Sequence, residues 1–507
     1  MPQDLPGFYY DPDKNRYFPV KGPIPGSRKS APQTPPSQPI QAQRLSRRDT
    51  GSSRLLHHRE LCGNIISFSK RKCSFKEEYT KKLASQPKVW KYHDLDRDGD
   101  AALTVVQTNI ETPVGLYRTD GLLTGGIGGS LSLFDVGNVG QDFNRGLRVT
   151  SDCVWPENNE QDLCKMPKDM WKLNGATLHM PSSISSISVP GKGHVWVDDD
   201  VRAAQCALIT TLGSDLSGGS LYLLNLTDPV DVNSSVPAVG RLRGLASLNC
   251  TIWTGDSDCI ARKAVVGTNF GATLVDVETG VSSTLCRSKS DVLSVQLNQL
   301  GNAVLCGLRN GAVVTVDLRQ RPNQLARHRI AYPSNGICGP CNRTVQNKKP
   351  WFLLRGNIQP SCTVYMPSAI SCLVSLQMYD QYFLASSMDG SIKLYDHRLT
   401  KRGAIQSYEG HVNSHTRVQL GIDPFERFVM SGGEDCKVRI WSIKSGELLF
   451  EEKFASTIPS TVSWQGNRGS SMLGNAMVGL EDCSYTASSS WDAWLGSVEG
   501  LFRMQFP

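Results

Sequence analysis

The sequence predicts an all-β protein of the propeller class, and three observations predict it. The chain has 507 residues, of which 39% are hydrophobic and 20% charged, with 46 glycines and 27 prolines. It is short of the Glu, Lys and Ala that fill long helices, so a helical array is not expected. From about residue 100 onward, short β-branched and apolar runs recur, each ending at Gly, Asn or Asp. Several of these runs return at steps of about 40 residues.

Residues 1–52 are expected to stay outside the packed core. Aromatic residues from Phe8 to Phe18 open the chain, and a Pro-, Ser- and Arg-rich stretch follows. That stretch buries too little apolar surface to offset the entropy lost on ordering, so it is predicted to be disordered. The sequence shows neither a signal peptide nor an apolar run of about 18 residues. With 15 scattered cysteines, this predicts reduced thiols and a location in the nucleus and cytoplasm.

The positive charge is concentrated near the start of the chain. Residues 1–90 hold 17 Lys and Arg against 7 Asp and Glu, whereas the remaining 417 residues hold 37 against 40. The basic clusters at 47–48 and 70–72 fit a nuclear address, a nucleic-acid contact or a solvated linker. Because the body is slightly acidic, nucleic acid is not an expected partner of the protein as a whole.

Residues 53–90 are predicted as a short helical segment. One helix is expected from Ser53 to Leu61. A second begins at Ser74, where Ser74 and Glu77 form a capping box, and it ends before Pro87. The segment leads into the repeated region.

The repeat is clearest in four windows. Each reads as a strand, a tight turn, a second strand and a closing Asp or Ser, which is the pattern of a β-hairpin. The steps between closing residues are 41 (Asp276 to Asp317) and 46 (Asp396 to Ser442). Repeats of about 40–45 residues with four strands are typical of a WD40 β-propeller. The windows are 263–277, 302–319, 382–398 and 427–443.

Weaker copies extend the repeat, so residues 91–507 are assigned to the propeller. At about 42 residues a unit, this length would hold nine or ten units. Inserted loops reduce the estimate to seven blades. The weaker copies lie at 128–136, 203–226 and 461–504, and the inserted loops near 137–195, 322–366 and 465–494.

Four polar and aromatic residues in the last clear window are assigned to structural support inside a blade. In WD repeats a His, Ser, Asp and Trp at this spacing form a hydrogen-bonded support. The candidates are His411, Ser431, Asp435 and Trp441. His411 as a catalytic base is the weaker interpretation.

No motif in the sequence predicts catalysis, a cofactor or a metal. Cys338 and Cys341 share the spacing of a thioredoxin motif, but no helical pattern follows them. A zinc site with Cys362 lacks a second cysteine pair, which leaves ordinary thiols as the default interpretation.

The acidic run Asp94 to Asp98 begins like a calcium loop, yet Val105 stands where a ligating Glu is required. The protein is therefore not expected to be an enzyme.

Two consecutive windows end with Asp and, two residues on, Arg. The pairs are Asp317 with Arg319 and Asp396 with Arg398. An exposed guanidinium at the rim of a propeller can make bidentate contacts with a partner. An arginine paired with its own aspartate, or simply solvated, is the alternative that the sequence leaves open.

The segment Leu394 to Arg398 resembles the blade endings of WD-repeat substrate receptors of cullin-4 RING ubiquitin ligases. A closer resemblance, at 5–18 and about 290–450, is to the family of damaged-DNA-binding protein 1 and cullin-4 associated factor 4. It includes the motif Tyr408 to Asn413. Val316 departs from the pattern, which has Trp or Tyr at that position.

The resemblance implies a non-catalytic receptor that recruits an unknown protein for ubiquitination. The adaptor, damaged-DNA-binding protein 1, would bind the rim, and the helices at 53–85 would enter its cleft. The alternative is a protein-interaction scaffold of a nuclear complex with no link to a ligase. The resemblance assigns adaptor binding to Tyr395, Asp396, Arg398, Asp317 and Arg319.

Overall fold

The computed structural model divides the chain into two compact units, Met1–Ile66 and Ser67–Pro507. In the first unit, β1 (Phe8–Asp11) and β2 (Arg16–Pro19) form an antiparallel hairpin. In the second unit, α2 (Phe75–Ala84) precedes the strands. The residues that the structure describes are 8–11, 16–19, 75–112, 115–137, 146–156, 170–190, 206–214, 217–231, 241–258, 262–319, 326–331, 351–465 and 491–507.

Seven sheets of four to six strands make up the second unit, as far as the structure describes it. Each sheet is called a blade and is numbered by its first, innermost strand. The innermost strands of blades 1 to 7 are β4 (Ala102–Thr112), β10 (Ile184–Ser188), β15 (Ile252–Ser257), β19 (Val292–Leu297), β25 (Ile370–Ser375), β29 (Leu420–Ile422) and β33 (Thr461–Gln465).

Second and third strands follow as hairpins in every blade. The second strands are β5 (Gly115–Gly125), β11 (Cys206–Thr211), β16 (Lys263–Thr268), β20 (Ala303–Leu308), β26 (Tyr382–Ser387), β30 (Phe428–Gly432) and β34 (Asp492–Ser497). The third strands are β6 (Ser130–Asp135), β12 (Ser220–Asn225), β17 (Gly271–Asp276), β21 (Ala312–Asp317), β27 (Ile392–Asp396), β31 (Val438–Ser442) and β35 (Gly500–Gln505).

A fourth strand lies on the outside of each blade. These are β9 (Met170–His179), β14 (Leu242–Ser247), β18 (Ser282–Ser288), β24 (Val364–Tyr365), β28 (Gln406–Tyr408), β32 (Leu448–Glu452) and β3 (Lys88–Tyr92). Further strands extend three blades: β13 (Val230–Asp231) and β7 (Gly146–Val149) in blade 1, β23 (Trp351–Gly356) and β22 (Arg327–Ala331) in blade 3, and β8 (Ser151–Trp155) in blade 7.

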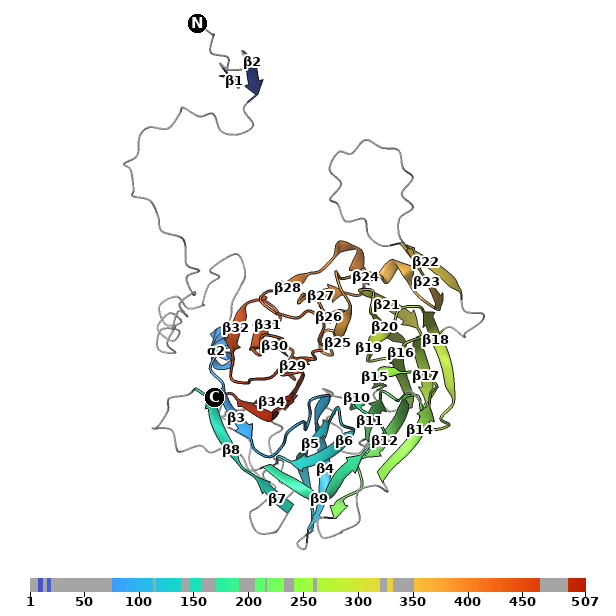
Figure 1. Cartoon of the computed structure of the whole chain (residues 1–507), viewed down its shortest axis with the longest axis vertical. Coiled ribbons are helices and arrows are strands. Elements are labelled where there is room, and N and C mark those ends of the chain that lie inside the picture. Colours follow the sequence, from blue (N-terminus) through green and yellow to red (C-terminus); the bar gives the residue numbers. More distant parts are fainter. Residues whose placement is uncertain are drawn as a thin grey trace, which may run out of the picture. The chain divides into compact units, whose positions relative to one another are not determined.

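The blades are arranged radially around a common centre (Figure 1). Each innermost strand contacts that of the next blade, and β33 of blade 7 contacts β4 of blade 1, which closes the ring. The four predicted windows form the second and third strands of blades 3 to 6. The prediction of an all-β WD40 propeller is therefore confirmed.

The turn between β20 and β21 shows why the windows need glycine. Gly311 has a φ of +83°, which L-residues with a side chain rarely adopt. A Cβ atom at this position would lie 2.4 Å from the carbonyl oxygen of Met366. The Asn-Gly pair of the sequence is thus required by backbone conformation and by space.

Blade 7 is completed by residues from distant parts of the chain. Its order is β33-β34-β35-β3-β8, and Val89 of β3 lies opposite Met504 of β35. Because every blade buries its faces only against its neighbours, this pairing seals the ring.

Side-chain oxygens on the innermost strands join neighbouring blades. Ser186 Oγ accepts the backbone N–H of Gly255 at 2.9 Å, Ser294 Oγ that of Leu373 at 3.0 Å, and Ser463 Oγ that of Val105 at 3.1 Å. These bonds satisfy backbone donors that would otherwise be buried without a partner.

Replacing Ser294 with alanine is expected to destabilise the ring by about 1–3 kcal/mol, because the buried N–H of Leu373 loses its acceptor. Urea unfolding followed by tryptophan fluorescence measures this. Ser283→Ala, at an exposed position on β18, is the control and should unfold like the wild type. Equal midpoints for both variants would contradict a stabilising role of the bond.

Segments expected to be inserted loops contain strands. Residues 137–195 include β7, β8, β9 and β10, and residues 322–366 include β22, β23 and β24. Residues 466–490 lie outside the described residues. No helix among the described residues has the length and apolar character needed to cross a membrane.

Candidate functional site

Arg319 and Arg398 adopt the same geometry at the ends of β21 and β27. Arg398 donates from Nε and Nη2 to the two carboxylate oxygens of Asp396, both at 3.2 Å, and Arg319 does the same to Asp317 at 3.0 and 2.8 Å. Each aspartate also accepts the backbone N–H of its arginine. The arginine-to-own-aspartate pairing that the sequence left open is the one found.

This pairing leaves the arginines available to a partner. Their side chains are 68% and 69% exposed, whereas the aspartates are buried. A guanidinium has five N–H donors, and the pairing uses two of them, so three point away from the aspartate. Hydrogen bonds from the arginines hold the pKa of both aspartates below the ordinary value. The carboxylates therefore stay charged and fix the orientation of each guanidinium.

Tyr395 does not belong to this exposed site, contrary to the expectation from the resemblance. Its side chain is 3% exposed and packs in the core against Phe383, with ring centroids 5.4 Å apart. Burial raises the pKa of Tyr395 to about 12. Alternate residues of a strand face opposite sides, and this strand turns Tyr395 toward the neighbouring blade. Tyr395 therefore belongs to the core shared by blades 4 and 5.

Exposed apolar side chains lie at the same end of the blades. The loops between the first and second strands lie at the same end of a blade as the ends of the third strands, as the pairing of Ala303 with Asp317 shows.

The loop of blade 4 carries Leu300, which is 77% exposed. The corresponding loops carry Met378 and Tyr379 in blade 5 and Phe425 in blade 6, all exposed. Together with Arg319 and Arg398, these residues define the arginine rim.

Hydrogen bonds hold the loops of the arginine rim together. Gln299 in blade 4 donates to the carbonyl of Gln377 in blade 5. Glu426 in blade 6 accepts the backbone N–H groups of Gln377 and Met378, the latter at 3.0 Å. The three loops thus form a continuous, ordered surface.

Phe425 is held in place although it faces solvent. The guanidinium of Arg427 lies 4.8 Å from the centre of the Phe425 ring and is itself paired with Asp423 at 2.7 Å. An exposed aromatic ring with a fixed position loses little entropy when a partner covers it. Sequence reasoning missed Leu300, Met378, Tyr379 and Phe425, because an exposed apolar residue in a loop cannot be told from a buried one by pattern.

The predicted blade support is assembled in a different pattern. His411 Nε2 lies 2.9 Å from the carbonyl oxygen of Gly432 and 3.3 Å from Ser431 Oγ. Trp441 Nε1 donates to the carbonyl of Glu409 at 2.8 Å. Asp435 pairs with the buried Arg439, so its carboxylate binds an arginine in place of the histidine.

His411 is expected to make the stability of the ring depend on pH. Burial lowers the pKa of His411 against the opposing effect of two carbonyl contacts. The unfolded chain therefore binds the proton first, and stability should fall as the pH decreases below about 6.5. His411→Gln should flatten this dependence in thermal unfolding between pH 7.5 and 5. The same slope in the variant and in the wild type would contradict the assignment.

The helix predicted from Ser74 is found as α2, and its end packs on the propeller. Ala84 is fully buried in the core cluster of blades 6 and 7. Ion pairs join Glu77 to Lys444 at 2.7 Å and Lys81 to Glu447 at 3.1 Å. The helix predicted at 53–61 and the Cys338–Cys341 pair lie outside the described residues.

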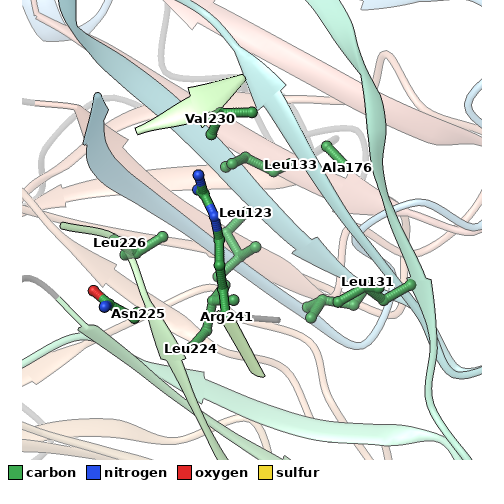
Figure 2. Close-up of a pocket in the computed structure, with 10 residues that line it drawn as sticks. Leu123, Leu131, Leu133, Ala176, Leu224, Asn225, Leu226, Val230 and Arg241 are labelled. Carbon is green, nitrogen blue, oxygen red and sulfur yellow. The ribbon is translucent and has the colours of Figure 1, made fainter. Parts of the chain in front are cut away.

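An apolar cavity between blades 1 and 2 is too small for an organic ligand. Its volume is about 20 Å³, enough for a single water molecule. Figure 2 shows Arg241 beside leucines from both blades. Among the described residues no group of three His, Cys, Asp or Glu side chains could hold a metal ion. The arginine rim, with its fixed guanidiniums and exposed apolar side chains, is the candidate site.

Comparison with known proteins identifies a related propeller. A family model of the "DDB1- and CUL4-associated factor 4 beta-propeller domain" matches residues 353–476. Human DDB1- and CUL4-associated factor 4 is 31% identical over 173 residues, which is 34% of this chain and 27% of that protein. Human DDB1- and CUL4-associated factor 4-like protein 2 is 30% identical over 187 residues, 37% of each chain.

A WD repeat-containing protein of Caenorhabditis elegans is 28% identical over 192 residues, which is 36% of this chain and 29% of that protein. The matches thus cover about a third of the length of each relative. The predicted resemblance to WD-repeat receptors associated with cullin-4 ligases is confirmed. Arg398 and Phe425 fall within the matched segment 353–476, whereas Arg319 precedes it.

Proposed function

We propose that this protein is a substrate receptor of a cullin-4 RING ubiquitin ligase and that it binds the adaptor damaged-DNA-binding protein 1 through the arginine rim. The observation that carries the proposal is the repeated Asp–Arg geometry of blades 4 and 5 beside an ordered apolar surface. Human relatives whose names state association with DDB1 and CUL4 support it.

The rim has the composition of a protein interface. Arginine and aromatic residues dominate the binding energy of such interfaces, and apolar contacts around them exclude water. Lys401 and Arg402 are also exposed near Arg398, after β27. The surface therefore combines positive charge with apolar contact area and fits an adaptor surface that carries carboxylates.

A receptor of this kind supplies no catalytic group. It holds a protein close to the ubiquitin-loaded enzyme, and the raised effective concentration accelerates transfer. The opposite end of the ring and the outer faces of the blades remain available for the recruited protein.

Affinity purification of the full-length protein from cells tests the proposal. We expect the adaptor and cullin-4 to co-purify, and the purified adaptor to bind the purified protein directly. Their absence would leave a WD40 scaffold without a ligase link. A charge reversal at the rim, Arg398→Glu, serves as the negative control for the direct measurement.

A further inference from the structure

A long stretch of the sequence carries Lys and Arg but no Asp or Glu. Residues 318–379 contain eight Lys and Arg and no Asp or Glu. The other residues of 91–507 hold 29 Lys and Arg against 40 Asp and Glu. The nearly neutral total charge of residues 91–507 is therefore the sum of one basic segment and an acidic remainder.

The basic segment adds a hairpin to the outside of blade 3. After β21 of blade 4, the chain forms β22 and β23, and β23 pairs with β18 before the chain returns to blade 4 as β24. Blade 3 thereby becomes a six-stranded sheet with β22 at its outer edge (Figure 1).

Three arginines lie side by side across this extension. Arg287 of β18 is opposite Arg355 of β23, and Arg355 is opposite Arg327 of β22. Paired residues on neighbouring strands share one face of the sheet. With strands about 4.8 Å apart, the row spans about 10 Å. Arg329, two residues beyond Arg327, faces the same side.

This arginine face is directed away from the core. The residues of the other face, Leu354 and Ile330, are buried in the cluster of blades 3 and 4. Arg287, Arg327 and Arg329 are exposed, and Trp351 on the same face is 49% exposed. Arg329 stacks on Trp351 at 4.8 Å, which fixes its guanidinium.

The row has no neutralising partner among the described residues. None of the ion pairs there involves Arg287, Arg327, Arg329 or Arg355. Like charges placed directly opposite each other destabilise a sheet. An anionic partner on this face would remove that repulsion.

We propose that this arginine face and the edge of β22 bind an extended acidic polypeptide segment that adds as a further strand. Glutamates or aspartates at alternate positions would meet Arg327 and Arg329, and the intervening residues would face the side of Ile330. No described strand pairs with the outer edge of β22, and the backbone N–H and C=O groups of that edge can pair with a polypeptide. The peptide site itself does not depend on the proposed function. The further step, that the bound segment belongs to a recruited substrate, rests on the proposed function.

A nucleic acid fits this surface less well. A phosphodiester backbone offers no N–H donors to the strand edge. Single-stranded nucleic acid binds on several aromatic platforms, and the arginine face has one exposed aromatic ring, Trp351, which Arg329 already covers on one side.

Fluorescence anisotropy with a labelled peptide, Glu-Val-Glu-Ile-Glu-Val-Glu, tests the proposal on the full-length protein. We expect saturable binding that weakens with salt and falls at least about tenfold in Arg327→Glu/Arg329→Glu. Lys263→Glu is the matched control, because Lys263 is exposed on the same blade but lies away from the arginine face. It should bind like the wild type.

Three further probes separate the alternatives. A peptide with the same residues but grouped glutamates, and a peptide N-methylated at alternate residues, should bind much more weakly. Equal binding of either would overturn strand addition, and tighter binding of an oligonucleotide of equal charge would overturn the polypeptide assignment. No binding of any probe would mean that the arginines only protect the edge from aggregation.

Adaptor binding is measured on the same samples. Arg327→Glu/Arg329→Glu should retain it, because these residues lie outside the arginine rim. If the wild type binds the acidic peptide but no adaptor, the proposed ligase role fails and the peptide site stands. If the wild type binds the adaptor but no acidic peptide, the peptide site fails and the proposed ligase role stands.

Discussion

Replacing Arg319 and Arg398 together with alanine is expected to lower the affinity for damaged-DNA-binding protein 1 at least about tenfold. Both guanidiniums face solvent and have N–H groups that the aspartates do not use. Their loss therefore removes contacts to the partner and leaves the core unchanged. Surface plasmon resonance with immobilised adaptor measures the effect. Circular dichroism and thermal unfolding should match those of the wild type.

Arg309→Ala is the matched control for this experiment. Arg309 is also exposed on blade 4, but it follows β20 and so lies at the opposite end of the blade from Arg319. Its variant should bind the adaptor like the wild type. Equal loss in both variants would point to general electrostatic attraction, and retained binding in the double variant would exclude the arginine rim.

Asp492→Ala is expected to cost about 3–5 kcal/mol of stability, the largest effect of any single substitution proposed for the fold. Arg503 on β35 is 1% exposed and pairs with Asp492 on β34. Removing the carboxylate leaves a buried guanidinium with insufficient compensation. Because both residues belong to blade 7, the loss also weakens the blade that closes the ring.

Chemical denaturation followed by tryptophan fluorescence checks this prediction. Asp291→Ala is the comparison, since it removes the surface ion pair with the largely exposed Arg309, and such pairs contribute about 0–1 kcal/mol. Asp492→Asn should fall between the two, because the amide keeps a hydrogen-bond acceptor. Equal stability of the Asp492 and Asp291 variants would show that the buried pair is dispensable.

The hairpins of the propeller could be predicted because their information is local. Asn310-Gly311 and Asp389-Gly390 specify turns by their backbone conformation. In the strands beside them, the pattern of apolar and small or polar residues can be recognised within a few positions. The closing strand β3 could not be found in this way. Its partner β35 lies more than 400 residues further along the chain, as the pair Lys91 and Glu499 shows, and no local pattern encodes such a pairing.

The candidate site was predictable only in part. The spacing of Asp317 and Arg319 located the arginines, but whether each was free or paired depended on side-chain geometry. Tyr395 was expected to bind the adaptor, yet its side chain is buried, because a motif does not show which face of a strand is buried. The sequence did not predict the cluster of Arg327 and Arg355. A charge count over 417 residues does not show a local basic segment, and the two arginines become neighbours only through the register of β22 and β23.

The construction of blade 7 has a consequence for synthesis of the protein. β3 leaves the ribosome early, but its partner β35 follows about 408 residues later, judged by Lys91 and Glu499. At about 5–20 residues per second, the edge of β3 that pairs with β35 stays open for roughly 20–80 seconds, although β8 can pair with the other edge much sooner. During that interval an apolar strand edge is open to wrong partners. A chaperone that shields nascent chains should therefore raise the yield of this protein more than that of a domain completed by neighbouring segments.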